Sequence, residues 1–485
     1  MKVVTNTLAD PAPQAEADIA ALFALQHAAS RADQEVSRAV RLDRIDRAIA
    51  MMVAHSDRLC AAMSADFGTR AEALNVATDV GGTIESLKAA RRNLRAWMRP
   101  ERRSMNFPMG LLGARGAVRY RPLGVICILG TWNFPIGTAT MPLVAALAAG
   151  NRVIIRPSEM TPRSAAALAE AVAEFFKPDE IAVVNGDASV ARYLTSLPFD
   201  RIIFTGGSAT ARHIMRAAAE NLVPLTLELG GKSPVIVGPS ANLAQVATEL
   251  AAGKLINAGQ ACVAPDYVLV PKDMREPLLE ALKTAFTRMA PRMQENPDYC
   301  SIAHERHREH LRHLLADARQ KGARELVINP ASEPLDASGG KILPRILLNV
   351  DETMSVMQQE IFGPILPIMD CETIDDAIAY VNARPRPLAL YYFGQDRREA
   401  EKVLSRTVSG GAVVNATLLH TVMENLPFGG VGGSGFGKYR GVDGFRECST
   451  AQAVLHQSRW NWAWQLLRPP YTPLKLRILR STVRQ

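Results

Sequence analysis

The sequence predicts an α/β fold with two units, each built around a sheet. After Pro100, short apolar runs alternate with Ala-rich helical stretches, a pattern typical of βαβ units in a parallel sheet. A second series of strands and helices begins at Leu229, with no self-similarity to the first at a fixed period. At 485 residues the chain also exceeds one core of ordinary size, so two domains are expected.

The individual elements follow from periodicity. Residues 16–98 are predicted to be helical, because apolar residues such as Leu42, Ile45 and Ile49 recur at spacings of three and four. Apolar runs predict the strands of the first sheet at 124–129, 152–155, 181–184, 201–204 and 235–237. The second unit is predicted from strands at 267–270 and 365–369 and from helices at 274–289, 303–318 and from 374 onward. The Gly-rich stretch 428–441 is expected to return the chain to the first domain.

Composition narrows the class of protein. The chain is 48% hydrophobic, contains no apolar run of the roughly 18 to 20 residues that span a bilayer, and shows no signal or transit pattern at its N-terminus. Its six cysteines lack C-x-x-C spacing, which favours reduced thiols in the cytoplasm over a disulfide frame or a metal site. The net charge of +8 is concentrated at 91–103 and 468–484, where solvated surfaces are favoured over nucleic-acid binding.

A phosphate-binding turn is the first candidate site. Thr205-Gly206-Gly207-Ser208 follows the strand 201–204 and precedes a helix at 209–219. Glycine backbone and a helix N-terminus at the carboxyl end of a strand suit phosphate, although ordinary turns share this pattern.

Three further residues are candidates for chemistry. Cys262 follows the Gly-containing loop Asn257-Ala-Gly-Gln260 and precedes an apolar run, so it is either a nucleophile at a cleft or an inert core thiol. Glu228 ends the apolar run 225–227 and precedes two glycines, so it is a general base or an exposed turn acid. Asn133 follows the strand 124–129 and is an oxyanion donor or an ordinary turn residue.

These four sites, in this order, resemble those of the aldehyde dehydrogenase superfamily from about residue 100 to residue 450. Further matches are Arg156-Pro157-Ser158-Glu159, Glu360-Ile-Phe362-Gly-Pro364 and the Gly-rich run 426–435. Within the superfamily, the run 260–267 (QACVAPDY) resembles the class 3 and coniferyl aldehyde dehydrogenase branch. The resemblance implies a Rossmann-type cofactor domain, a second α/β catalytic domain and a small β oligomerisation arm.

The resemblance also implies domain limits. Residues 1–228 would form N-terminal helices and the NAD(P)-binding domain, with a candidate dimerisation arm near 116–122. Residues 229–415 would form the catalytic domain, and 416–485 would return to the cofactor domain and end in a tail.

The implied reaction is NAD(P)-dependent oxidation of an aldehyde to an acid. Cys262 would form a thiohemiacetal and then a thioester, Asn133 would hold the oxyanion, and Glu228 would activate the hydrolytic water. An aromatic, coniferyl-like aldehyde is the expected substrate, with a medium- or long-chain aliphatic aldehyde as the alternative. Two rivals are a CoA-acylating relative, which generally lacks the glutamate, and a non-catalytic dinucleotide-binding protein, which would be free to lose these residues.

The resemblance assigns the cofactor contacts as well. Glu360 would bind the nicotinamide ribose, Phe362 and Trp132 would border the nicotinamide ring, and Arg156 and Glu159 would flank the adenosine ribose. The remaining contacts are Gly206, Gly207, Ser208, Ala211 and Leu229. The chain departs from the family in Arg156, where lysine is usual, and in Ala211, where glycine is usual. Because arginine suits a 2′-phosphate and Glu159 a free diol, either NAD or NADP is expected, with NAD favoured.

The histidines are not assigned to the active site. His304, His307, His310 and His313 recur every three residues, which spreads them around a helix and favours a solvated face over a metal site. No role is assigned to His213 or His420.

The C-terminal segment is aromatic and basic, with Trp460, Trp462, Trp464 and Tyr471. Packing on the body or a second subunit is favoured over contact with a membrane surface. The resemblance implies a homodimer.

Overall fold

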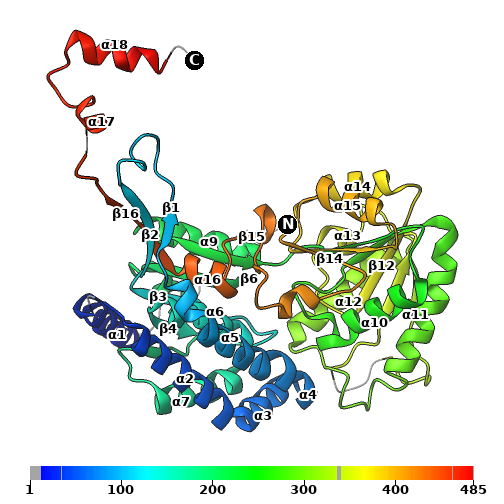
Figure 1. The fold of residues 1–485 in the computed structure, drawn as a ribbon. Helices are drawn as coiled ribbons and strands as arrows, with labels where there is room; N and C mark the ends of the chain where they lie inside the picture. Colours follow the sequence, from blue (N-terminus) through cyan, green and yellow to red (C-terminus); the bar gives the residue numbers. More distant parts are fainter. Residues whose placement is uncertain (1–12, 34, 336–339, 461, 484–485) are drawn as a thin grey trace.

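The computed structural model describes residues 13–33, 35–335, 340–460 and 462–483. These residues form two α/β units, each built on its own sheet, and one small antiparallel sheet (Figure 1). The prediction that the N-terminus, residues 1–18, carries no targeting signal falls largely on residues 1–12, which lie outside the described part. Both predicted α/β units are therefore present.

The first sheet has six strands in the order β15-β7-β6-β3-β4-β5. All neighbours are parallel except β15, which is antiparallel to β7. The strand order reverses between β3 and β6, and ligands of such sheets bind at the carboxyl ends beside this point. The strands are β3 (Val125–Leu129), β4 (Arg152–Arg156), β5 (Ile181–Val183), β6 (Arg201–Gly206), β7 (Leu225–Leu229) and β15 (Gly435–Phe436).

Helices cover both faces of this sheet. One face packs on the layer that includes α6, whose apolar residues are almost all buried, and the other packs on α1, α8 and α9. The predicted helical region 16–98 is divided into successive helices, with a π-helical turn, η1 (Val76–Val80), before α5. The helices of this part are α1 (Pro13–Ala32), α2 (Arg38–Ala54), α3 (Ser56–Phe67), α4 (Glu72–Asn75), α5 (Gly81–Trp97), α6 (Gly137–Ala149), α7 (Pro162–Phe175), α8 (Ala188–Ser196), α9 (Ser208–Ala219) and α16 (Gly441–Glu447).

The second sheet has seven strands in the order β10-β11-β12-β9-β8-β13-β14, parallel except for β10. The run 235–237 was predicted in the first sheet, and this was wrong. Periodicity identifies a buried strand but not its neighbours, and β8 pairs with β9 and β13. The strands are β8 (Pro234–Val237), β9 (Tyr267–Pro271), β10 (Arg324–Val327), β11 (Arg345–Leu348), β12 (Ile365–Cys371), β13 (Ala389–Phe393) and β14 (Gly411–Val414). The helices are α10 (Leu243–Leu255), α11 (Arg275–Met289), α12 (Glu305–Gln320), α13 (Ser355–Gln358), α14 (Ile374–Asn382) and α15 (Arg397–Arg406).

The third sheet is a projecting arm. It joins β1 (Glu101–Arg103), β2 (Arg115–Pro122) and β16 (Ser449–His456) in antiparallel order, so the expected arm near 116–122 is a strand. Beyond β16, α17 (Trp462–Gln465) and α18 (Pro473–Ser481) lie clear of the rest of the chain (Figure 1). Within the described residues, no helix has the length and apolar character needed to cross a membrane.

Candidate active site

The predicted chemical residues surround one cavity of about 440 Å³. Asn133 follows β3, Gly206 ends β6 and Glu228 lies in β7, so three neighbouring strands of the first sheet contribute to it. Cys262 reaches it from the loop before β9, and Glu360 from the segment before β12. The cavity lies at the carboxyl ends of the first sheet, as the strand order predicts.

A tightly bonded loop presents Cys262. Before it, Asn257 and Ala258 both have φ of 51°, and Gly259 has φ of 72°. A side chain at Gly259 would meet the carbonyl oxygen of Gly363 at 2.5 Å, so this turn requires glycine. The Gln260 side chain donates to the carbonyls of Asn257 (2.8 Å) and Ser301 (3.0 Å), which holds the loop in its strained conformation.

Asn133 is joined to the same loop. Its Nδ2 donates to the Gln260 carbonyl at 3.1 Å, and its own carbonyl accepts from Asn257 Nδ2 at 2.9 Å. Its side chain is buried, and the amide nitrogen carries a second hydrogen. Asn133 thus holds a donor hydrogen in a fixed position at the cavity wall, as an oxyanion donor would require.

A buried ion pair beneath the site was not predicted. Arg70 Nη2 contacts Asp79 Oδ2 at 2.9 Å, and both side chains are fully buried. Arg70 Nε donates to Asn257 Oδ1 at 3.2 Å, while Asp79 accepts from the backbone N–H of Gly137 at 2.8 Å. The pair therefore ties the start of α6 to the Cys262 loop. No local sequence signal marks it, because Arg70 and Asn257 are far apart along the chain.

Glu228 is buried instead of exposed. It is 2% exposed, and neither carboxylate oxygen has a hydrogen-bond partner among the described residues. Desolvation by burial raises the pKa of this carboxyl well above its usual range, although Lys438 and Arg440 act in the opposite direction. The alternative of an exposed turn acid is excluded, and the raised pKa suits a group that takes up a proton near neutrality.

The Cys262 thiol is protonated at rest. Desolvation in the cavity wall, followed by the nearby carboxyl groups of Glu360 and Glu228, raises its pKa to about 12. A nucleophilic role for this thiol would therefore require removal of its proton before or during attack.

Most predicted cofactor residues line the same cavity. Trp132, Gly206, Gly207, Leu229, Glu360 and Phe362 all belong to its wall. The Glu360 Oε1 atom is buried without a partner among the described residues, and burial together with Asp266 raises the pKa of Glu360 to about 8. A side chain at Gly230 would collide with this carboxylate, so the backbone there is pressed against Glu360.

Four predicted cofactor residues lie outside the wall of this cavity. Ser208 begins α9, and Ala211 is buried in the core beneath that helix, so its methyl group packs against the protein. Arg156 is buried at the end of β4, with Nη2 2.7 Å from Glu159 and 2.9 Å from the Gly186 carbonyl. Arg156 and Glu159 therefore form an ion pair with each other.

Sequence reasoning missed the apolar side of the cavity. The cavity is also lined by Met141, Ile256, Val263, Leu418, Leu419, Val422, Phe428 and Tyr439. Val263, Phe428 and Tyr439 lie in runs that the sequence marks, but the other residues come from distant parts of the chain and belong to none of its motifs. Only the fold brings them together.

The solvated-face interpretation of the histidines was wrong for three of them. His304, His307 and His310 are only partly exposed, because α12 packs against the segment that contains Phe362. The ring of Trp132 lies 5.2 Å from His304 and 5.4 Å from His307. His313 alone is exposed.

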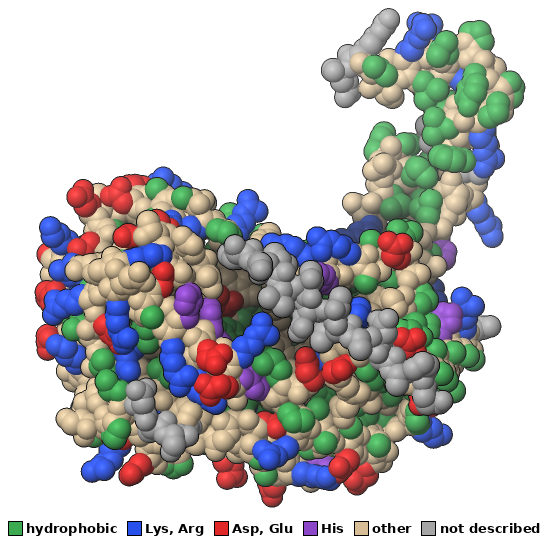
Figure 2. Space-filling view, turned by 180° about the vertical axis from the view of Figure 1, so that it is seen from behind, with side chains coloured by type: hydrophobic (Ala, Val, Ile, Leu, Met, Phe, Trp, Pro, Cys, Tyr) green, Lys and Arg blue, Asp and Glu red, His purple; other side chains and the backbone are tan. Residues whose placement is uncertain are grey.

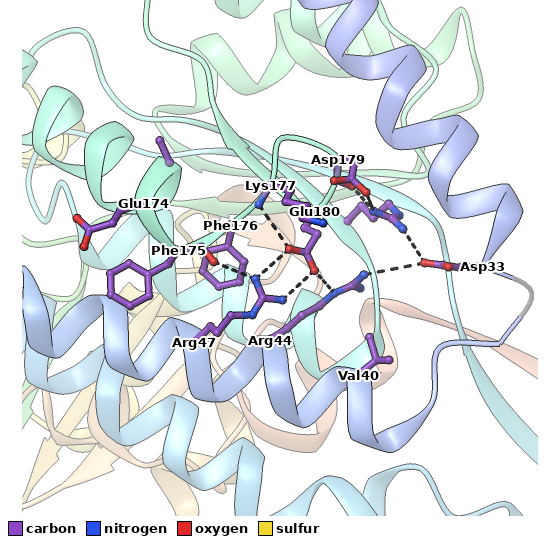
Figure 3. Close-up of a pocket in the computed structure, with 12 residues that line it drawn as sticks. Asp33, Val40, Arg44, Arg47, Glu174, Phe175, Phe176, Lys177, Asp179 and Glu180 are labelled. Atoms are coloured by element: carbon purple, nitrogen blue, oxygen red, sulfur yellow. Dashed lines mark hydrogen bonds and ion pairs between the residues drawn. The ribbon is translucent and has the colours of Figure 1, made fainter.

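A second hollow, of about 560 Å³, lies near the amino ends of β4 and β5 (Figure 3). Several of its charged groups are paired with one another. Arg47 contacts Glu180 at 2.8 Å, and Arg152 contacts Asp33 at 2.6 Å. We assign no chemistry to it.

Comparison with known proteins identifies the family. The profile of the "Aldehyde dehydrogenase family" matches residues 3–454. This chain belongs to the aldehyde dehydrogenase family. It is an oxidoreductase that acts on aldehydes, and the family uses NAD or NADP.

The chain is similar to named relatives over most of its length. It is 48% identical over 433 residues to the "Coniferyl aldehyde dehydrogenase" of Pseudomonas sp. (strain HR199 / DSM 7063), which covers 89% of each chain. The solved "Substrate bound state of Staphylococcus Aureus AldH" is 33% identical, with a TM-score of 0.89, and covers 96% of this chain and 99% of that one. The structure of "PnpE in complex with Nicotinamide adenine dinucleotide" is 25% identical, with a TM-score of 0.81, and covers 92% and 90% of the two chains.

Proposed function

We propose that this aldehyde dehydrogenase oxidises an aromatic aldehyde of the coniferyl type, with Cys262 as nucleophile and Glu228 as general base. The main support is the meeting of Cys262, Asn133 and Glu228 at one cavity, where Glu228 is buried with both oxygens unpartnered among the described residues.

The first step is attack by Cys262. Its thiol gives its proton to solvent as sulfur bonds to the carbonyl carbon, and the electron pair of the C=O π bond moves to the carbonyl oxygen as negative charge. The second hydrogen of Asn133 Nδ2 and the Cys262 N–H stabilise this oxyanion, and Asn133 is held for this role by Gln260 and Asn257.

The second half of the reaction depends on Glu228. The chemistry that a bound nicotinamide supplies is acceptance of a hydride, which leaves an acyl group on Cys262. Glu228 takes a proton from water as the water oxygen adds to the acyl carbon. The C–S bond then breaks, which releases the acid and the Cys262 thiolate.

The residues at the cavity fit a nicotinamide dinucleotide. The unpartnered Glu360 oxygen suits ribose hydroxyls, and the aromatic rings of Trp132 and Phe362 suit the faces of a planar ring. The position beyond Gly207, at the start of α9, is open and suits a pyrophosphate.

We propose NAD as the preferred coenzyme. Arg156 already contacts Glu159 at 2.7 Å, so its charge is compensated, and the exposed Glu159 carboxylate would repel a 2′-phosphate. Ser208 and Ala211 are proposed to act through the backbone and packing of α9.

Substrate and coenzyme are tested together by the rate of nicotinamide reduction. Coniferyl aldehyde, benzaldehyde and a medium-chain aliphatic aldehyde are compared with NAD and NADP on wild type, Cys262→Ala and, as a matched control, Cys371→Ala. The proposal expects coniferyl aldehyde with NAD to be the best pair, loss of activity in Cys262→Ala alone, and wild-type activity in Cys371→Ala. A faster aliphatic aldehyde would support the alternative substrate class.

We also propose a homodimer that uses the arm and tail. The tail exposes Trp460, Tyr471 and Leu474, and the loop between β1 and β2 exposes Phe107 and Leu111. Figure 2 shows hydrophobic and basic side chains together on the projecting tail. Such apolar surface is expected to be covered, either by a second copy or, less favoured, by an anionic membrane surface. A monomeric mass in light scattering would contradict the dimer.

The proposed compartment is the cytoplasm. All six cysteines are free thiols, and five of them are buried. A reducing environment is compatible with this arrangement.

A further inference from the structure

Phe362 occupies an unusual backbone conformation at the cofactor side of the cavity. Its φ is 54°, in the left-handed region that bulky residues rarely adopt. Its ring lies 5.3 Å from that of Trp132, nearly perpendicular to it. A strained residue of this kind persists only where surrounding contacts hold it in place.

His307 makes the contact that holds Phe362. From α12, its Nε2 lies 2.7 Å from the Phe362 carbonyl oxygen. A carbonyl only accepts hydrogen bonds, so Nε2 carries the hydrogen and donates it. Burial lowers the pKa of His307 to about 4, so the ring is neutral near pH 7.

The same imidazole packs on both aromatic walls. Its ring centroid is 5.4 Å from Trp132 and 5.9 Å from Phe362. The next residue, Gly363, is so close to α12 that a side chain there would meet Leu311 at 2.5 Å. Helix α12 therefore fixes this segment from behind, with His307 as its polar contact to the Phe362 backbone.

We propose that His307 is a positioning residue for the nicotinamide cofactor, acting through the Phe362 carbonyl and the Trp132 ring. This inference rests on the proposed function, which takes Phe362 and Trp132 as walls of the cofactor site. His307 does not itself line the cavity, so its effect is on cofactor binding through these two residues.

Three substitutions separate the hydrogen bond from general packing. His307→Gln keeps a donor at a similar distance from the backbone, whereas His307→Asn is too short to reach and His307→Leu removes the donor. His313→Leu, on the exposed side of the same helix, is the matched control. NAD binding is measured by calorimetry without aldehyde, and kcat and KM for each substrate are measured separately.

The expected result is a dissociation constant for NAD raised about tenfold in His307→Leu and His307→Asn, in line with one lost hydrogen bond. The KM for NAD should rise with it, while the KM for the aldehyde should change little. His307→Gln should recover most of the affinity, and His313→Leu should match wild type.

Two outcomes would overturn the role of His307 and leave the proposed function standing. One is unchanged NAD affinity in His307→Asn, and the other is an affinity in His307→Gln as low as in His307→Asn. If His307→Leu does not fold, the Gln and Asn pair still decides the question. If wild type binds neither NAD nor NADP, the proposed function fails together with this inference.

Discussion

Asn257 donates its side-chain amide to the Asn133 carbonyl at 2.9 Å, and this bond joins the loop of Cys262, the proposed nucleophile, to the loop of Asn133, the proposed oxyanion donor. The two loops come from different sheets. Because they are bonded directly to each other, a movement of one sheet edge relative to the other would disturb the nucleophile and the donor together.

Removal of the Asn133 amide should slow the reaction without preventing cofactor binding. Asn133→Ala is expected to lower kcat by about 10² to 10³, the usual effect of losing one oxyanion donor. Steady-state kinetics measures the loss, and calorimetry with NAD is the control. A kcat close to that of wild type would show that Asn133 does not hold the oxyanion.

The buried Arg70–Asp79 pair should be important for stability. Arg70→Met leaves the Asp79 carboxylate buried without its cation and is expected to cost about 3 to 5 kcal/mol in the free energy of unfolding. Adding Asp79→Asn to Arg70→Met removes the unpaired negative charge and keeps an oxygen that accepts from the Gly137 N–H. The double variant should therefore recover part of the lost free energy of unfolding. Denaturant unfolding measures both variants.

A surface ion pair provides the comparison for that experiment. Arg58 contacts Glu170, and both side chains are about half exposed. Arg58→Met is expected to cost less than about 1 kcal/mol. Equal losses in Arg58→Met and Arg70→Met would argue against a special role for the buried pair.

The raised pKa of Glu228 predicts how its stability contribution depends on pH. The folded state keeps the Glu228 proton up to a higher pH than the unfolded state does. The free energy of unfolding therefore falls as the pH rises from the usual carboxyl range through the raised pKa. Glu228→Gln, which stays neutral, should therefore have a higher Tm than wild type, with a gap that grows with pH. Thermal unfolding from pH 4 to pH 9 measures it. A constant gap would mean that Glu228 ionises normally.

Substitution of Glu159 is expected to change the preference between NAD and NADP. Glu159→Gln removes the carboxylate that compensates Arg156 and should raise the ratio of kcat/KM for NADP to that for NAD by about tenfold. Kinetics with both coenzymes measures the ratio. An unchanged ratio would place the 2′-position away from this pair.

The sequence predicted the motif-bearing parts of the site better than its surroundings. Asn133, Gly206 and Glu228 each follow or end an apolar run, so their place at the carboxyl end of the sheet follows from chain order. Arg70 and Asp79 carry no such signal, since their role arises from contacts with Asn257 and Gly137.

The histidine series shows the same limit. The three-residue spacing was expected to spread the four side chains around a helix, but His304 precedes α12, and His307 stacks on His310 with their ring centroids 5.7 Å apart. Periodicity also could not show that the segment of Phe362 packs on that helix. The partners of His307 are therefore visible only in the fold. Likewise, the run 235–237 was identified as a strand, but its sheet was set by pairing with β9 and β13.

The most direct test of the account is the mass of Glu228→Gln after reaction with coniferyl aldehyde and NAD. If Cys262 forms the acyl intermediate and Glu228 activates the water, one equivalent of reduced coenzyme should form quickly, and the protein should gain one acyl group on the peptide that contains Cys262. Wild type should show no lasting adduct, and Cys262→Ala should show neither. Full turnover by Glu228→Gln at the wild-type rate, or an adduct on another residue, would contradict the assigned roles.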